Sequence, residues 1–189
     1  GKAVRVAVFD TISALTTTGF QTVDYGNWNG SGIFILVILM LIGGGTYSTA
    51  GGIKQFRIYL VWKLILWEIK RFFLPRTAIV VYPFQEGERI VQITPAFVRQ
   101  IIAFITIYLF LYVCGVLVLC ASGFTLEKSL FEFASAIGTV GLSVGVTSAN
   151  MPLTALWAET IAMFLGRLEF IVVIVTVIKL GKDFRTMLR

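Results

Sequence analysis

The sequence has no histidine, only two cysteines and few charged residues, which make up 14% of its 189 residues. Without histidine, Ser-His-Asp and Cys-His catalysis and the HExxH zinc site are excluded. Cys114 and Cys120 lie in an uncharged run and would face different sides of a helix, which argues against a disulfide and a CxxC metal site. A soluble domain carries about 25% charged residues, whereas 57% of this sequence is hydrophobic. The composition predicts an all-α membrane protein surrounded by the lipid bilayer.

The charges that are present are unevenly distributed and sum to a net charge of +6. Basic residues concentrate in residues 54–99 and 179–189, whereas 19–32, 122–129 and 142–158 carry almost no charge. This asymmetry follows the positive-inside rule and predicts that residues 54–99 and the C-terminus are cytoplasmic. Nucleic-acid binding would need basic residues interleaved with exposed aromatic ones, so we expect no nucleic-acid partner. The chain begins with glycine and no signal sequence leads it, so we expect a piece of a longer protein.

Two long apolar segments are candidates for membrane-spanning helices. Ile101–Ala121 contains no charged residue and as a helix is about 31 Å long, enough to cross one bilayer. Leu153–Lys179 is apolar except for Glu159, Arg167 and Glu169. A charge inside an apolar helix faces the protein interior by default, so we expect Arg167 to face a pore; the alternative is that its side chain reaches the membrane surface. We expect Glu159 near the outer end of this helix, exposed to solvent.

A third apolar segment is interrupted by glycines. Gly32–Ile42 covers only about 16 Å as a helix, and the segment Gly43–Gly52 separates it from an apolar run over Ile53–Trp67. Non-helical backbone at membrane depth needs protein or a water-filled cavity to satisfy its polar groups, and a glycine-broken span is typical of a transport site. We predict a glycine-broken transmembrane helix; the alternative is a short amphipathic helix followed by a surface loop.

Two shorter apolar segments, Val4–Leu15 and Leu126–Ile137, belong to an internal repeat. Each is too short to cross a bilayer and leads into a stretch of threonine and glycine, and residues 9–20 match residues 131–142. The repeated unit is a half-length helix, a loop and a long helix, which predicts helix–pore helix–filter loop–helix modules like those of potassium channels. The match continues, shifted by one residue, between Met40–Gly44 and Met163–Arg167.

The loop after each half-length helix has the properties of an ion filter. A helix that ends at mid-membrane directs the negative end of its dipole at the centre, which favours a cation there. Glycine in the loop permits positive φ, so that successive carbonyls can face a pore and replace the hydration shell of an ion. The candidate filter residues are Thr16, Thr17, Thr18, Gly19 and Phe20 in the first copy, and Gly138, Thr139, Val140, Gly141 and Leu142 in the second.

Two acidic residues, Asp10 and Glu132, occupy the same position of the two half-length helices. Two roles are open for them. They can raise the local concentration of cations, or they can accept hydrogen bonds from amides behind the filter.

These features resemble the Trk/Ktr/HKT superfamily of potassium transporters, specifically its bacterial Trk-type members. The resemblance rests on Thr16–Phe20, on Ser48–Lys54 after the broken helix, and on Gly166–Glu169. It implies four modules around one pore in a single chain. Residues 1–75 would then be the third module without its first helix, and residues 100–189 the fourth module and a cytoplasmic tail. Between them lies a cytoplasmic segment, 76–99, in which the sequence indicates a small hairpin over Val80–Ile93.

The resemblance also implies roles for individual residues. Gly19 and Gly141 correspond to filter glycines, which go with potassium selectivity, and Arg167 corresponds to an arginine that projects into the pore. Tyr47 departs from the family pattern, which usually has small residues there. Potassium would bind the backbone carbonyls of Thr17, Thr18, Thr139 and Val140. The gate would be an intramembrane loop below the filter that contains Gly43, Gly44, Gly45, Ser48, Thr49, Ala50, Gly51, Gly52 and Lys54.

The function implied by the resemblance is potassium transport across the bacterial plasma (inner) membrane by the pore-forming subunit of a Trk-type uptake system. Potassium is then the transported substrate, no organic cofactor is expected, and the protein is not an enzyme. The implied partners are the missing N-terminal half of the pore, a second copy in a homodimer, and a cytoplasmic nucleotide-binding subunit of the RCK type.

Two alternatives remain at the level of the sequence. A secondary transporter of another cation, such as sodium, or of a small solute could use half-length helices and glycine-broken spans. A carrier of an anionic solute would direct helix N-termini, not C-termini, at its substrate. A membrane-embedded enzyme would need Glu159 and Glu169 to face one buried cavity.

Overall fold

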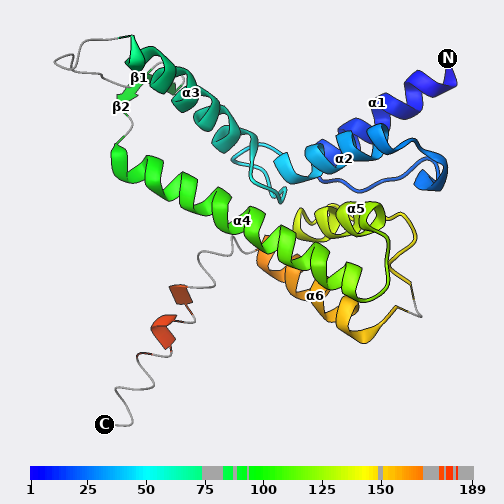
Figure 1. Ribbon diagram of the computed structural model, residues 1–189. Helices are drawn as coiled ribbons and strands as arrows, with labels where there is room; N and C mark the ends of the chain where they lie inside the picture. The colour runs from blue at the N-terminus through cyan, green and yellow to red at the C-terminus, as the bar shows by residue number, and fades with distance from the viewer. Residues whose placement is uncertain are drawn as a thin grey trace.

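The computed structural model describes residues 1–73, 94–148 and 151–167, the strands at 83–86 and 89–92, and short helical stretches at 175–176, 178–180 and 182. The two predicted half-length helices are present as α1 and α5, and α5 has the bounds that the sequence predicted. Figure 1 shows the elements in chain order: α1 (Lys2–Leu15), η1 (Tyr25–Asn27), α2 (Gly30–Ile42), α3 (Gln55–Phe72), β1 (Pro83–Glu86), β2 (Arg89–Gln92), α4 (Pro95–Ala121), α5 (Leu126–Ile137) and α6 (Leu153–Arg167).

Helix α4 is long and apolar enough to cross a membrane, and α2 is a shorter apolar helix. The sequence placed the start of the α4 span at Ile101, but the helix begins at Pro95. The Thr94 side chain accepts a hydrogen bond from the Phe97 amide at 3.4 Å, and proline is favourable at the first helical position because its missing N–H is not needed there. Apolarity therefore marked the part of the helix that fits a bilayer, and the cap set where the helix begins.

The broken helix is present as predicted. Helix α2 ends at Ile42 and α3 begins at Gln55, and the twelve-residue interval between them is non-helical. Gly43 ends α2 with φ of 71°, a conformation that glycine adopts without steric cost, and its N–H still bonds to the Leu39 carbonyl.

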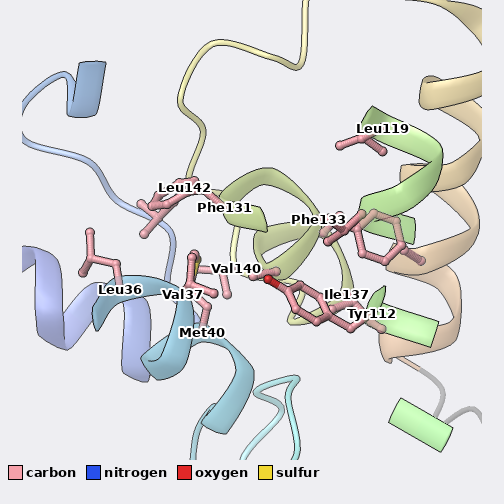
Figure 2. Close-up of a cluster of buried hydrophobic side chains, with 14 of the residues drawn as sticks. Leu36, Val37, Met40, Tyr112, Leu119, Phe131, Phe133, Ile137, Val140 and Leu142 are labelled. Carbon is pink, nitrogen blue, oxygen red and sulfur yellow. The ribbon is translucent and has the colours of Figure 1, made fainter. Parts of the chain in front are cut away.

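Helix α5 lies at the centre of the packed region, in contact with α2, α4 and α6. Its residues from Phe131 to Ile137 are buried on every side, as expected for a helix enclosed by protein. Gly115 of α4 allows this packing, because a Cβ there would lie 1.8 Å from the ring of Phe133. Figure 2 shows side chains of α2, α4, α5 and the loop after α5 meeting in this core, among them Leu36, Val37, Met40, Tyr112, Leu119, Phe131, Phe133, Ile137, Val140 and Leu142.

Two short antiparallel strands connect α3 to α4 (Figure 1). Pro83 of β1 pairs with Gln92 of β2, and Glu86 pairs with Arg89. Both strands fall within Val80–Ile93, where the sequence indicated a hairpin; residues 87–88 between them lie outside the described part.

Candidate functional site

The two half-length helices end in the same backbone arrangement. At the end of α1, the Thr17 amide bonds to the Ala14 carbonyl at 3.3 Å and the Thr18 amide to the Ser13 carbonyl at 3.0 Å. At the end of α5, the matching bonds run from Thr139 to Ala136 at 3.1 Å and from Val140 to Ser135 at 2.9 Å. This pair of bonds is the Schellman motif, in which the residue after the cap adopts a left-handed conformation. The internal repeat is therefore a repeat of structure and not only of sequence.

The residue in that left-handed position is a threonine in both copies. Thr17 has φ of 55° and Thr139 has φ of 52°. A left-handed conformation costs a residue with a Cβ about 1–2 kcal/mol. Such a residue persists only where the surrounding structure holds it in place, and residues of this kind are frequent at functional sites. The sequence predicted positive φ for the glycines of these loops but not for the threonines.

The predicted positive φ of the two filter glycines is observed, with 78° at Gly19 and 97° at Gly141. The sign of φ thus alternates over three residues in each loop: Thr17 and Gly19 are positive on either side of Thr18, and Val140 is flanked in the same way. The two loops also touch, because a Cβ on Gly19 would lie 1.9 Å from the Val140 carbonyl oxygen. Gly19 is therefore required both by its φ and by the approach of the second loop.

A serine in the last turn of each half-length helix forms a hydrogen bond to the loop that follows. Ser13 Oγ donates to the Phe20 carbonyl at 2.7 Å, whereas Ser135 Oγ accepts a hydrogen bond from the Gly141 amide at 3.1 Å. The two serines match in sequence, but they bond to different backbone groups. The two loops consequently follow a similar backbone path but differ in the hydrogen bonds that connect them to their helices.

Of the two acidic residues behind the loops, Glu132 accepts hydrogen bonds from amides, one of the two roles left open, whereas Asp10 accepts from a hydroxyl. Glu132 is buried and accepts hydrogen bonds from the amides of Val144 and Thr147, each at 3.0 Å. Asp10, also buried, accepts one from the hydroxyl of Thr22 at 3.0 Å. Both carboxylates therefore fasten the chain behind the loops.

The expectation for Glu159 was wrong. On the sequence alone, Glu159 was expected near the outer end of the helix, exposed to solvent, but only 3% of this residue is exposed. Helix α6 packs against α4 and α5, and this packing covers the side chain. Glu159 lies 3.1 Å from the Thr147 hydroxyl, in the loop after α5. The rule applied to Arg167, that a charge inside an apolar helix faces the protein interior, would have predicted this burial, whereas the contact with Thr147 depends on the tertiary packing.

The glycine-rich segment between α2 and α3 leaves the end of α2 and returns to it. The amides of Ile53 and Lys54 bond to the carbonyls of Leu41 and Ile42 at 2.9 and 2.8 Å. A Cβ on Gly43 would lie 2.2 Å from the Gly51 carbonyl oxygen, so the start and the end of this loop are in contact. The interruption is therefore a closed loop with its own hydrogen bonds.

This loop lies directly against the base of the second candidate filter. A Cβ on Gly51 would lie 2.2 Å from the Gly138 carbonyl oxygen and 2.6 Å from Thr139 Oγ1. Arg167, at the end of α6, donates a hydrogen bond from Nη1 to the Thr49 carbonyl at the loop tip. The structure thus brings together residues from three separate predicted segments. Gly45 and Tyr47 lie apart from this contact, and the Tyr47 side chain is 96% exposed.

Two cavities meet at Arg167. One, of about 590 Å³, is lined by filter residues including Val140 and Gly141. The other, of about 220 Å³, is lined by the loop residues Ser48–Gly52 and by Lys54. Arg167 lines both, so this residue borders the space beside the candidate filter and the space beside the loop.

Comparison with known proteins gives one consistent result. Residues 1–186 match the sequence model of the TrkH family, described as a cation transport protein. The chain is 32% identical to an uncharacterized cation transporter of Methanocaldococcus jannaschii over 89% of its length and 35% of that protein. It is 30% identical to the Trk system potassium uptake protein TrkH of Halomonas elongata over 92% of its length and 36% of that protein. The chain thus spans about a third of the length of these relatives.

A solved structure shows the same fold. The crystal structure of the potassium transporter TrkH from Vibrio parahaemolyticus matches 93% of this chain and 37% of its own, with a TM-score of 0.78 and 28% sequence identity. The predicted fold class, a helical membrane protein of repeated pore-helix modules, is confirmed by this likeness.

Proposed function

Because the chain belongs to the TrkH family of cation transport proteins, we propose that it forms two of the four modules of a potassium-conducting pore. The observation that carries this proposal is the pair of matching loops after α1 and α5. They share the two backbone hydrogen bonds that end each helix and the alternation of φ, and they touch at Gly19 and Val140. One such loop is a common helix end. Two in contact, each at the C-terminal end of a half-length helix, favour a cation between them.

Selectivity in this proposal comes from the backbone. The carbonyls of Thr17, Thr18, Thr139 and Val140 bind potassium in place of its hydration shell. Alternating signs of φ turn successive peptide planes so that their carbonyls face one side, which supports this assignment. Potassium is the transported substrate, in keeping with the name of the Halomonas relative.

Flow through the pore is controlled by the loop Gly43–Gly52 and Arg167. The loop is seated against the filter base at Gly51, and Arg167 holds its tip through the Thr49 carbonyl. In the closed state the loop obstructs the pore below the filter, and the charge of Arg167 opposes the entry of cations. Opening then requires this hydrogen bond to break.

The complete transporter acts at the bacterial plasma (inner) membrane in this proposal, with residues 54–99 and the C-terminus in the cytoplasm. The asymmetry of basic residues supports that orientation. The first two modules come from the remainder of the same polypeptide. A homodimer partner and a nucleotide-binding RCK-type subunit complete the assembly, the latter docking on the basic segment that contains the β1–β2 hairpin.

The test is rubidium and potassium uptake by the complete transporter in cells that lack their own potassium systems. Gly141→Ser is compared with Gly123→Ser. The two glycines have nearly equal φ, 97° and 98°, and neither has another group within 4 Å of a Cβ position. Both substitutions therefore impose the same backbone strain, but only one lies in the candidate filter.

We expect Gly123→Ser to transport as the parent does, and Gly141→Ser to lose its preference for potassium or to pass sodium. If the parent moves no potassium with its partners present, or if both variants behave alike, the filter assignment fails. A coupled transporter of sodium or of a small solute then becomes the better explanation.

A further inference from the structure

Glu132, a residue of α5, accepts four hydrogen bonds from residues of the loop that follows this helix. Its Oε2 accepts from the Val144 amide at 3.0 Å. Its Oε1 accepts from Ser143 Oγ at 2.6 Å, from the Thr147 amide at 3.0 Å and from Thr147 Oγ1 at 2.5 Å. Two of these donors are amides, which cannot accept a hydrogen bond in return. All four groups donate, so the Glu132 carboxyl group acts as an acceptor at both of its oxygens.

Glu159 has a very different environment, although it lies on the other side of the same threonine. Its Oε2 is 3.1 Å from Thr147 Oγ1, and its Oε1 is buried with no hydrogen-bond partner among the described residues. Arg167 on the same helix is about 12 Å further along the axis and donates to Thr49 instead. Glu159 and Arg167 both line the cavity of about 590 Å³, but among the described residues no basic side chain pairs with Glu159, and a carboxylate with one oxygen unpaired is disfavoured in the interior.

The hydroxyl of Thr147 has one hydrogen and faces two carboxyl groups. We assign that hydrogen to the shorter contact, 2.5 Å to Glu132, because the shorter of the two distances marks the stronger hydrogen bond. The longer contact, 3.1 Å to Glu159, then lacks a hydrogen unless Glu159 supplies one. The three groups fit a chain in which Glu159 donates to Thr147 and Thr147 donates to Glu132.

We propose that Glu159 carries a proton in the folded protein and acts, through Thr147, as a positioning residue for the loop after α5. A carboxylic acid explains both of its oxygens: the hydroxyl oxygen donates to Thr147, and the carbonyl oxygen remains as a neutral acceptor. The protonated acid connects α6, which carries Arg167, to the loop that contains Gly141. The role in filter geometry rests on the proposed function, whereas the protonation of Glu159 does not.

The internal repeat supports a neutral residue at this position. With Met40 matched to Met163, the residue of the first copy that corresponds to Glu159 is Leu36, which is buried and apolar. The first loop has fewer hydrogen bonds to its acidic residue: Asp10 Oδ1 accepts from Thr22, and Asp10 Oδ2, like Glu159 Oε1, is buried with no hydrogen-bond partner among the described residues. The second carboxyl group is thus an addition specific to the second copy.

The first experiment measures protonation directly, by infrared spectroscopy of the purified complete transporter at neutral pH. A carboxylic acid has a C=O absorption that a carboxylate lacks. We expect Glu159→Gln to remove such a band. Glu127→Gln, on the exposed start of α5, is the matched control and leaves the band in place. If Glu159→Gln leaves the band unchanged, or if only Glu132→Gln removes it, the proposal is overturned whether or not the protein transports potassium.

The second experiment measures potassium uptake and the preference for potassium over sodium. Glutamine has the shape of a protonated glutamate and can donate to Thr147, so we expect Glu159→Gln to retain uptake and preference within about twofold. Glu132→Gln and Thr147→Val are expected to lower them by about tenfold or more, as for loss of a hydrogen bond to a charged group.

Thr147→Ser separates this role from a loss of folding, because it keeps the hydroxyl and removes only a methyl group. We expect it to restore most of the uptake and preference lost in Thr147→Val. Glu159→Leu, which reproduces the residue of the first copy, removes the donor and is expected to lower the preference for potassium while the protein still folds. Equal behaviour of Thr147→Ser and Thr147→Val, or a larger loss in Glu159→Gln than in Glu132→Gln, contradicts the proposed chain.

Discussion

Replacing Arg167 tests the proposed gate most directly, because this residue makes the contact between α6 and the tip of the loop. Arg167 Nη1 donates to the Thr49 carbonyl, and the same side chain lines both cavities. Arg167→Ala removes the hydrogen bond and the positive charge together. Arg167→Lys keeps the charge but not the planar guanidinium that reaches Thr49. The two substitutions therefore separate the bond from the charge.

The size of each effect follows from ordinary magnitudes. A hydrogen bond from a charged donor contributes about 1.5–3 kcal/mol, which corresponds to a shift of about 10- to 150-fold in the equilibrium between closed and open loop. A unit charge at roughly 8 Å from a passing cation opposes it by about 0.5–2 kcal/mol for an effective dielectric constant between 80 and 20. The hydrogen bond contributes more than the charge, so most of the effect should already be present in Arg167→Lys.

Initial rates of rubidium uptake by the complete transporter provide the assay. We expect uptake to rise in Arg167→Lys and to rise further in Arg167→Ala, up to the point at which the open state predominates. Arg71→Ala is the control, because Arg71 is an exposed arginine whose ion pair with Glu68, at 3.8 Å, lies on the surface of α3. Uptake in Arg167→Ala equal to that of Arg71→Ala would refute the role of this contact in gating.

Three further predictions concern packing and capping. Gly51→Ala places a Cβ 2.2 Å from the Gly138 carbonyl oxygen, so the loop has to move by about 1 Å; we expect raised uptake and a loss of about 1–3 kcal/mol in thermal unfolding. Gly166→Ala gains about 1 kcal/mol of helix propensity but meets the Ile137 carbonyl oxygen at 2.1 Å, and the clash outweighs the gain, so the melting temperature falls. Asn29→Ala removes the N-cap of α2 and lowers stability by about 0.5–2 kcal/mol, with no change in potassium preference.

Gly30→Ala is the common control for the two glycine substitutions. A Cβ at Gly30 makes only an ordinary contact of 3.7 Å, so this variant should unfold as the parent does. Unchanged stability in Gly51→Ala and Gly166→Ala would mean that these close approaches are absent from the protein. A changed ion preference in Asn29→Ala would mean that α2 is coupled to the filter more strongly than its cap implies.

The elements and their repetition were predictable because they depend on local patterns. Helix α5 has its predicted bounds, and α1 begins within two residues of its prediction. The break between α2 and α3 followed from glycine, which weakens a helix wherever it occurs in numbers. The positive φ of Gly19 and Gly141 was predictable for the same reason, since glycine alone adopts that conformation without cost.

The backbone conformation of the two threonines and the hydrogen bonds of the two serines were not predictable from local patterns. Two threonines with left-handed backbone contradict their own preference, and only the hydrogen bonds of the surrounding helix end maintain them. The matching serines Ser13 and Ser135 donate in one copy and accept in the other. The serine occupies the same position in both copies, so its position in the repeat does not predict which backbone group it bonds to.

The amino-acid sequence by itself determined the helical membrane class, the repeated half-length helices, the glycine-broken span and the family resemblance. All of these follow from apolarity, spacing and residue type within short windows of the chain. Only the tertiary structure decided that Glu159 contacts Thr147 and that Arg167 reaches Thr49. These contacts join residues on different elements, and their energy depends on the distance and burial of both partners, which no local pattern of residues specifies.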